Sequence, residues 1–125
     1  MKQATVFAII LIGSMGFASC GGDDNSLDPN KTMGQMTVAD QEKLCDATNN
    51  AQGGYGRSVT CSDGSMERTD PDRASCVGVM PEAMRRCGNL KIGEALSCFN
   101  AFGKDLCRFY VEPLCEPLRK CIGLP

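Results

Sequence analysis

The most regular pattern of apolar positions lies in residues 92–102. Ile92, Leu96, Phe99 and Phe102 recur at intervals of three and four residues, which places their side chains on one stripe of an α-helix. Gly103 follows directly and is a residue type that commonly closes helices. The pattern therefore predicts a helix whose stripe belongs to the core. A groove for a partner is the alternative role for the same side chains.

A second helix is predicted after Thr37. Thr37 is a favourable N-cap residue, and Asp40 lies at the third helical position, where a capping box places an acidic or amide side chain. A glycine pair that begins at residue 53 is expected to follow the end of this helix. Residues 55–61 are then expected to be extended, and residues 62–65 to form a turn.

Prolines set the expected limits of the remaining elements. Thr69 or Asp70 is expected to begin another helix, with Pro71 at its first position and Asp72 near its positive end. Pro81 is expected to end it, because the residue before a proline is pushed out of the helical region. Pro113 and Pro117 are expected to break the C-terminal tail into turns. The expected fold class is mainly α: a small domain of three to four short helices with long loops.

The N-terminus has the pattern of a secretory signal peptide. Lys2 precedes a short apolar run at residues 4–12, which is too short for an ordinary membrane span. The following Phe17-Ala18-Ser19-Cys20 resembles the lipobox of bacterial lipoproteins, although leucine is usual where this chain has Phe17. The resemblance implies that residues 1–19 are removed and that Cys20 carries the lipid.

Residues 20–36 are expected to be lipidated Cys20 followed by a flexible linker, since they are polar and lack periodicity. The stapled domain is then expected to span residues 37–125. Two or more acyl chains on Cys20 would anchor it stably to a membrane. By resemblance to bacterial sorting rules, Gly21 favours the outer membrane over the inner one. Ordinary cleavage after Ala18, which gives a freely secreted protein, is the alternative.

The number of cysteines is the most informative feature of the composition. The chain of 125 residues has nine cysteines, and eight of them follow Cys20. An even set at this density in a short exported chain predicts a disulfide scaffold. No CxxC pair is present, which argues against thioredoxin-like exchange and zinc ribbons. The spacing leaves the connectivity open among Cys45, Cys61, Cys76, Cys87, Cys98, Cys107, Cys115 and Cys121.

Charge and composition narrow the functional classes. The formal net charge is −2, and Arg85-Arg86 is an isolated basic pair, so the chain has no basic cluster for nucleic acid. Histidine, the commonest general base and metal ligand, is absent. Serine hydroxyls therefore lack the usual activating base, and no metal or cofactor is expected. The acidic residues that could serve as paired carboxylates or calcium ligands are Asp63, Glu67, Asp70 and Asp72, although turns and a helix start account for them as well.

A glycine-rich loop holds the side chains that are the weak candidates for binding. Tyr55 lies within this loop and Arg57 follows it, and tyrosine and arginine are enriched at binding hot spots. The loop matches neither a P-loop nor a dinucleotide-binding fingerprint. An ordinary turn that carries one aromatic residue is the alternative.

The segment from Leu44 onward resembles a group of small cysteine-rich predicted lipoproteins of some large-genome soil bacteria. The resemblance covers about two thirds of the chain. It implies location and class, with no assigned activity. Its matching features are Leu44-Cys45-Asp46, Gly53-Gly54-Tyr55-Gly56 with Cys61, the helix with Cys76, Gly93-Glu94 before Cys98, Leu106-Cys107, and the ending with Pro113, Cys115, Leu118 and Cys121.

These observations favour a non-enzymatic interaction or binding module anchored to the cell envelope through the lipid on Cys20. Its partner, a protein or a small ligand, is not identified by the sequence. A small extracytoplasmic enzyme or thiol-redox protein is one alternative. A purely structural envelope component is another.

Overall fold

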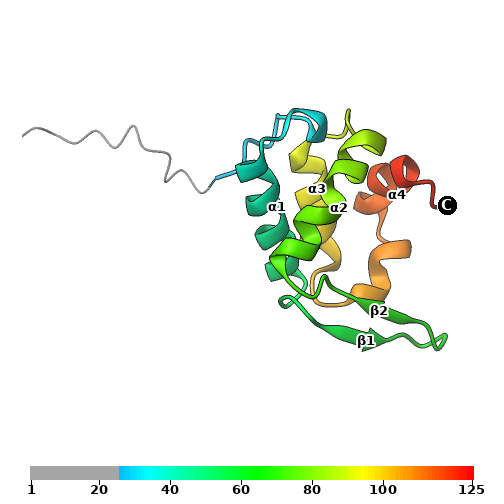
Figure 1. The fold of residues 1–125 in the computed structure, drawn as a ribbon. Coiled ribbons are helices and arrows are strands. Elements are labelled where there is room, and N and C mark those ends of the chain that lie inside the picture. Colours follow the sequence, from blue (N-terminus) through cyan, green and yellow to red (C-terminus); the bar gives the residue numbers. More distant parts are fainter. Residues whose placement is uncertain (1–25) are drawn as a thin grey trace, which may run out of the picture.

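The computed structural model describes residues 26–125, so the predicted leader and Cys20 lie outside the described residues. The domain is mainly helical, with one short β hairpin (Figure 1), and this confirms the predicted fold class. No helix within residues 26–125 has the length and apolar character required to cross a bilayer. The elements are η1 (Met33–Gln35), α1 (Val38–Ala51), β1 (Ser58–Thr60), β2 (Met66–Arg68), α2 (Arg73–Arg86), α3 (Ile92–Phe102), η2 (Leu106–Tyr110), η3 (Pro113–Cys115) and α4 (Glu116–Ile122), where η denotes a 3₁₀ helix.

Helix α3 lies at the centre of the core, as its apolar stripe predicted. It contacts α1, α4 and both 3₁₀ helices of the C-terminal segment. Ile92 and Phe102 are buried, whereas Leu96 and Phe99 are only partly buried against the same cluster. Gly103 follows the helix at φ 53°, a left-handed backbone conformation that glycine adopts without steric penalty. The stripe is therefore buried at both ends and partly exposed at Phe99.

Helix α1 begins as predicted. The Asp40 backbone N–H donates to the Thr37 hydroxyl at 3.2 Å, and the Thr37 backbone N–H donates to the Asp40 carboxylate at 2.9 Å. This reciprocal capping box satisfies two backbone donors that a helix start leaves unpaired. Leu44 and Cys45 then face the core and are buried.

The predicted limits of the second helix are wrong. Helix α2 begins after Asp72, whose carboxylate accepts from the Ser75 N–H at 2.7 Å, and it continues through Pro81 to Arg86. Pro81 is exposed, and it leaves the carbonyl of the half-buried Val77 without its usual helical partner. The preceding residue, Met80, is buried and packs into the core.

The prediction of a flexible linker up to residue 36 is wrong for its last part. Met33 and Met36 are buried, and they pack with the core. The Met33 N–H donates to the Leu90 carbonyl at 2.8 Å, and the Ile92 N–H donates to the Lys31 carbonyl at 2.9 Å. The two methionines lack a periodic context in the sequence, but they cover the connection between α2 and α3. The folded unit therefore begins before Thr37.

Strands β1 and β2 form an antiparallel hairpin in which Val59 pairs with Glu67. The expected turn at residues 62–65 is confirmed, because the Cys61 N–H donates to the Ser65 carbonyl across it at 2.8 Å. The second strand was not predicted, because three residues give too short a pattern. The hairpin extends from the helical body beside η2 (Figure 1).

The C-terminal segment is more helical than the expected turns. Pro117 lies in the first turn of α4, where a proline removes no hydrogen bond that the helix would make. Arg119 of α4 is nearly buried, and it donates to the carbonyl oxygens of Phe109 and Glu112 at 2.8 Å each. These bonds fix α4 against the end of η2.

Four disulfides join elements that are distant in the sequence, which confirms the predicted scaffold. Three of them have at least one buried cysteine, whereas both cysteines of the Cys61–Cys107 bond are partly exposed. Multiple disulfides indicate folding in an oxidising, extracytoplasmic environment. The pairs are Cys45–Cys76 (α1 to α2), Cys61–Cys107 (hairpin to η2), Cys87–Cys121 (α2 end to α4) and Cys98–Cys115 (α3 to η3).

Candidate functional site

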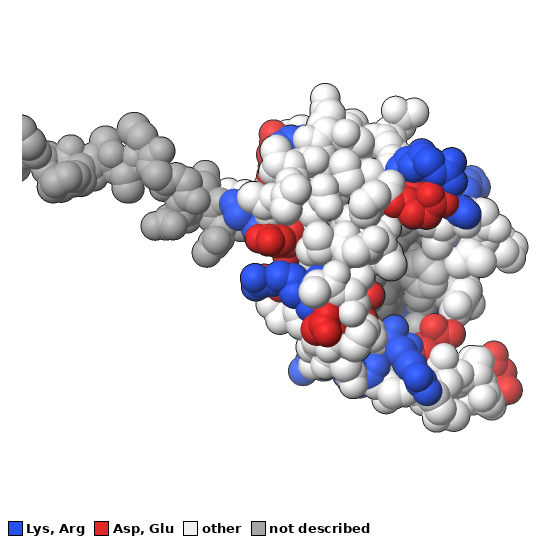
Figure 2. Space-filling view, viewed as in Figure 1, with Lys and Arg blue, Asp and Glu red and all other residues white. Residues whose placement is uncertain are grey.

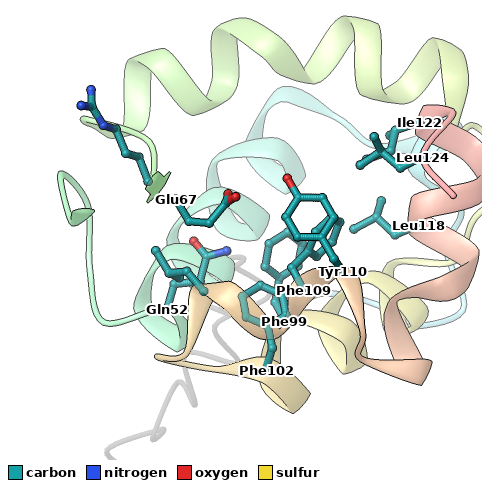
Figure 3. A pocket seen from close by; sticks show the side chains of 11 residues that line it. Gln52, Glu67, Phe99, Phe102, Phe109, Tyr110, Leu118, Ile122 and Leu124 are labelled. Atoms are coloured by element: carbon teal, nitrogen blue, oxygen red, sulfur yellow. The ribbon is translucent and has the colours of Figure 1, made fainter. Parts of the chain in front are cut away.

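The surface is hollowed between the hairpin, α3, η2 and the C-terminal segment (Figures 2 and 3). We call this hollow the aromatic groove; its volume is about 420 Å³, within the range of small-molecule sites. Its lining is predominantly apolar, and the polar side chains in it are Gln52 just after α1, Glu67 and Arg68 of the hairpin, and Tyr110. The lining residues are Gln52, Glu67, Arg68, Phe99, Phe102, Leu106, Phe109, Tyr110, Leu118, Ile122 and Leu124.

Four aromatic rings form a continuous series along the groove. The ring centroids of Phe99 and Phe102 are 5.4 Å apart, those of Phe102 and Phe109 are 5.7 Å apart, and those of Phe109 and Tyr110 are 5.3 Å apart. The last two pairs are edge-to-face, a favourable arrangement of ring quadrupoles. Burial decreases along the series from Phe102, which is in the core, to Tyr110, which is 48% exposed. The rings therefore connect the core to the open surface.

Covalent bonds hold the walls of the groove. Cys61–Cys107 joins the hairpin to η2, which carries Phe109 and Tyr110. Cys87–Cys121 joins the end of α2 to α4 beside Ile122. These links limit the motion of the walls, so the groove is pre-formed. Binding of a ligand therefore costs little conformational entropy of the protein.

A smaller hollow of about 280 Å³ adjoins the groove on the α2 side. It shares Gln52, Arg68, Phe99 and Leu118 with the groove, and it extends towards Met80 and Ala83 of α2. Phe99 therefore lines both hollows. Within the predicted stripe, Phe99 is a partly buried side chain with one side facing the two hollows.

Comparisons with known proteins give no relative. No protein-family profile matches the chain, and no curated protein or solved structure matches it. The site is therefore interpreted from its own geometry.

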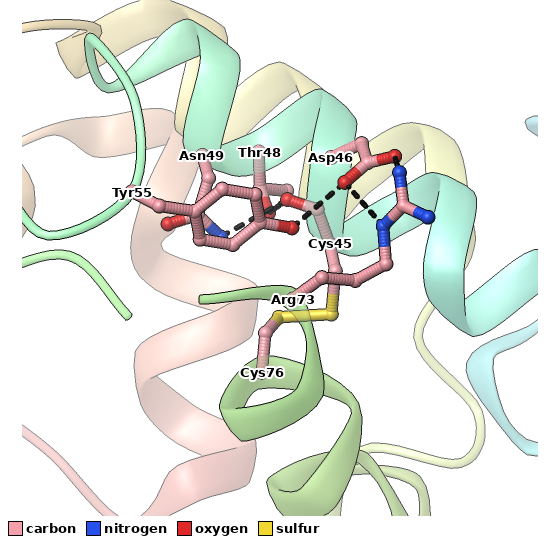
Figure 4. A network of polar contacts seen from close by, with 7 residues as sticks. All are labelled: Cys45, Asp46, Thr48, Asn49, Tyr55, Arg73 and Cys76. Carbon is pink, nitrogen blue, oxygen red and sulfur yellow. Dashed lines mark hydrogen bonds and ion pairs between the residues drawn. A yellow bond between two sulfur atoms is a disulfide. The ribbon is translucent and has the colours of Figure 1, made fainter. Parts of the chain in front are cut away.

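The predicted candidates Tyr55 and Arg57 lie away from the groove lining, in internal polar contacts. The Tyr55 hydroxyl donates to Asp46 at 2.8 Å, and Arg73 donates to the same carboxylate, with its Nε at 2.9 Å (Figure 4). Arg57 donates to the backbone carbonyls of Gln52 and Lys104. Both side chains bind the glycine-rich loop to its surroundings.

The hydrogen-bond network around Asp46 shifts the pKa values of Asp46 and Tyr55. The Arg73 guanidinium holds the pKa of the Asp46 carboxyl below its usual range, with a smaller contribution from the Tyr55 hydroxyl. Burial and then the neighbouring Asp46 carboxylate raise the pKa of Tyr55 to about 12. At the other end of α1, hydrogen bonds from Lys31 and the Thr37 backbone hold the pKa of Asp40 at about 2. Both carboxylates therefore stay ionised in the folded domain.

These carboxylates are expected to make the fold acid-sensitive. Because their pKa values are lower in the folded than in the unfolded chain, their contribution is complete above about pH 5 and is lost as the pH falls through the folded values towards 2. Urea unfolding midpoints measured from pH 6 to pH 2 should therefore fall most steeply below pH 4. The Asp40→Asn, Asp46→Asn double variant should be less stable at pH 6 and show a flatter decline. An acid decline as steep as that of the wild type would contradict the assignment.

The acidic candidates for calcium or hydrolysis do not gather into one site. Asp63 accepts from the backbone and the hydroxyl of Ser65, Asp72 caps α2, and Asp70 accepts from Asn49 at 3.2 Å. Within residues 26–125, no group of three or more acidic, cysteine or histidine side chains is placed to hold a metal ion. Glu67 alone of the four lines the aromatic groove.

The groove residues missed by sequence reasoning are those of the hairpin and the C-terminal segment. Phe109 and Tyr110 follow Gly103 and lie beyond the periodic stripe of residues 92–102. Glu67 was considered only as a possible metal or catalytic carboxylate. Leu124 lies near the chain end, where a single leucine gives no pattern. The available signal was the alternative role of the Phe99 stripe as a groove.

Proposed function

We propose that this protein is a non-enzymatic binding module of the bacterial cell envelope, anchored through lipid on Cys20, and that the aromatic groove takes a small, mainly apolar ligand. The observation that carries the proposal is a pre-formed groove lined by Phe99, Phe109 and Tyr110 on a disulfide scaffold. An exposed, concave aromatic surface usually serves for binding.

The alternatives receive less support. A thiol-redox function needs a reactive thiolate, but all eight cysteines in residues 26–125 are paired. A hydrolytic function needs a nucleophile and base or two facing carboxylates, and the acidic candidates have separate structural roles. A purely structural component has no need for a hollow in its surface. Binding therefore accounts for the groove best.

The test uses n-octanol as a neutral apolar probe. We expect octanol to shift the amide resonances of the groove residues in a ¹⁵N-labelled sample of the oxidised domain. Leu124→Asp places a charge at the groove lining and should weaken octanol binding by about fivefold or more, since burial of each methylene contributes about 0.8 kcal/mol. The titration reports both the location and the affinity.

Leu114→Asp is the matched control, because Leu114 is 55% exposed and lies outside the groove. It should bind octanol as the wild type does. The proposal fails if saturating octanol leaves the groove resonances unchanged, or if both variants weaken binding equally.

A further inference from the structure

Glu67 is the single acidic side chain of the groove, and strand geometry explains its direction. Side chains alternate between the two faces of a strand. Met66 and Arg68 of β2 are exposed, whereas Glu67 and its partner Val59 on β1 are partly buried on the inner face. A carboxylate therefore occupies an inward position where an apolar side chain is expected.

The Glu67 carboxylate points toward the Tyr110 hydroxyl across the mouth of the groove (Figure 3). Burial raises the pKa of Tyr110, and the neighbouring Glu67 carboxylate raises it further. The phenol thus stays neutral, and the negative charge at this end of the groove belongs to Glu67.

Glu67 makes no ion pair with a lysine or arginine in the described part of the chain, whose ion pairs use other carboxylates. Arg57, directly before β1, and Arg68 of β2, which also lines the groove, have other partners. Arg68 is exposed and donates to the Met66 sulfur at 3.0 and 3.3 Å, and Arg57 donates to backbone carbonyls. The inward-facing Glu67 carboxylate thus has no ion-pair partner among the described residues.

We infer that the groove selects an organic cation with an apolar body, such as an alkylammonium or alkyl quaternary ammonium compound. The inference rests on the proposed binding function and names the ligand class. The cationic head lies against Glu67 and the ring of Tyr110, where the carboxylate and the ring quadrupole both attract it. The alkyl chain runs over Phe109 towards Leu118 and Ile122. The groove volume of about 420 Å³ accommodates a chain of medium length.

The test compares three probes that share an eight-carbon chain: n-octyltrimethylammonium, n-octanol and n-octanoate. Affinities are measured by calorimetry and amide-shift titration on the full oxidised domain, well below micelle formation. We expect the wild type to bind the ammonium probe about tenfold more tightly than octanoate, the factor that corresponds to about 1.4 kcal/mol. Glu67→Gln should reduce this preference to about twofold or less, because it removes the charge that favours the ammonium head over the carboxylate of octanoate.

Glu42→Gln is the matched control, because Glu42 is exposed on α1 outside the groove and the substitution changes the net charge equally. It should keep the tenfold preference. Equal affinities of the wild type for the three probes, or an equal loss of preference in both variants, would overturn the inference and leave the binding function intact. Failure of all three probes to bind would overturn both.

Discussion

Complete reduction of the four disulfides is expected to unfold the domain. Each bridge closes a loop of 17 to 46 residues between separate elements. In the chain-entropy model such a bridge stabilises by about 3–4 kcal/mol. A hydrophobic core of this size supplies little stability without such links. Far-UV circular dichroism in excess reductant should therefore lose its helical signal, and alkylation followed by mass measurement should count eight new groups.

The control is the same sample alkylated before reduction, in which none of the eight cysteines should react. Partial reduction offers a second readout, because both residues of Cys61–Cys107 are partly exposed, whereas Cys98 and Cys115 are fully buried. Label should appear first at Cys61 and Cys107. A native helical spectrum with eight alkylated cysteines would show that packing alone maintains the fold.

Loss of Cys20 is expected to abolish lipid attachment. Wild-type protein expressed with its own leader in a bacterium should partition into the detergent phase and have the mass of residues 20–125 plus two or three acyl chains. Two or more chains give stable anchoring, which one chain does not. Cys20→Ala should carry no acyl mass, whether it remains an uncleaved precursor or is cleaved after Ala18.

Cys45→Ala, Cys76→Ala is the control, because it removes one disulfide and leaves the lipobox unchanged. It should keep the acyl mass and the detergent partition even if the domain is destabilised. A wild-type product that begins at Ser19 without lipid would make the protein a secreted one and remove the anchor from the proposal.

Local sequence patterns predicted the elements whose limits are set by residues close to them in the sequence. The capping residues fixed the start of α1, and the apolar stripe with Gly103 fixed α3. Helix α2 passes through Pro81 because tertiary contacts outweigh the local effect of proline. One is the Cys45–Cys76 bond in its first half, and another is the Cys87–Cys121 bond just after its last turn. A single sequence does not reveal such covalent partners.

The aromatic groove could not be predicted from the sequence for a related reason. Its lining comes from the hairpin, α3, η2 and the chain end, which the disulfides and Arg119 bring together. The types of its residues were visible in the sequence, but their convergence was not. Tyr55 had the favoured residue type for a hot spot, yet the nearby Asp46 engages its hydroxyl inside the fold.

The connectivity also has a consequence for biogenesis. Each of the four bonds passes over at least one other cysteine, so no bond joins two successive cysteines of the chain. In a polypeptide that enters an oxidising compartment N-terminus first, Cys45 and Cys61 meet the oxidant together before Cys76 emerges. A bond between them is non-native, and it must be exchanged before the domain can mature. An isomerase is therefore expected to speed the maturation of the domain, since disulfide exchange is slow without one.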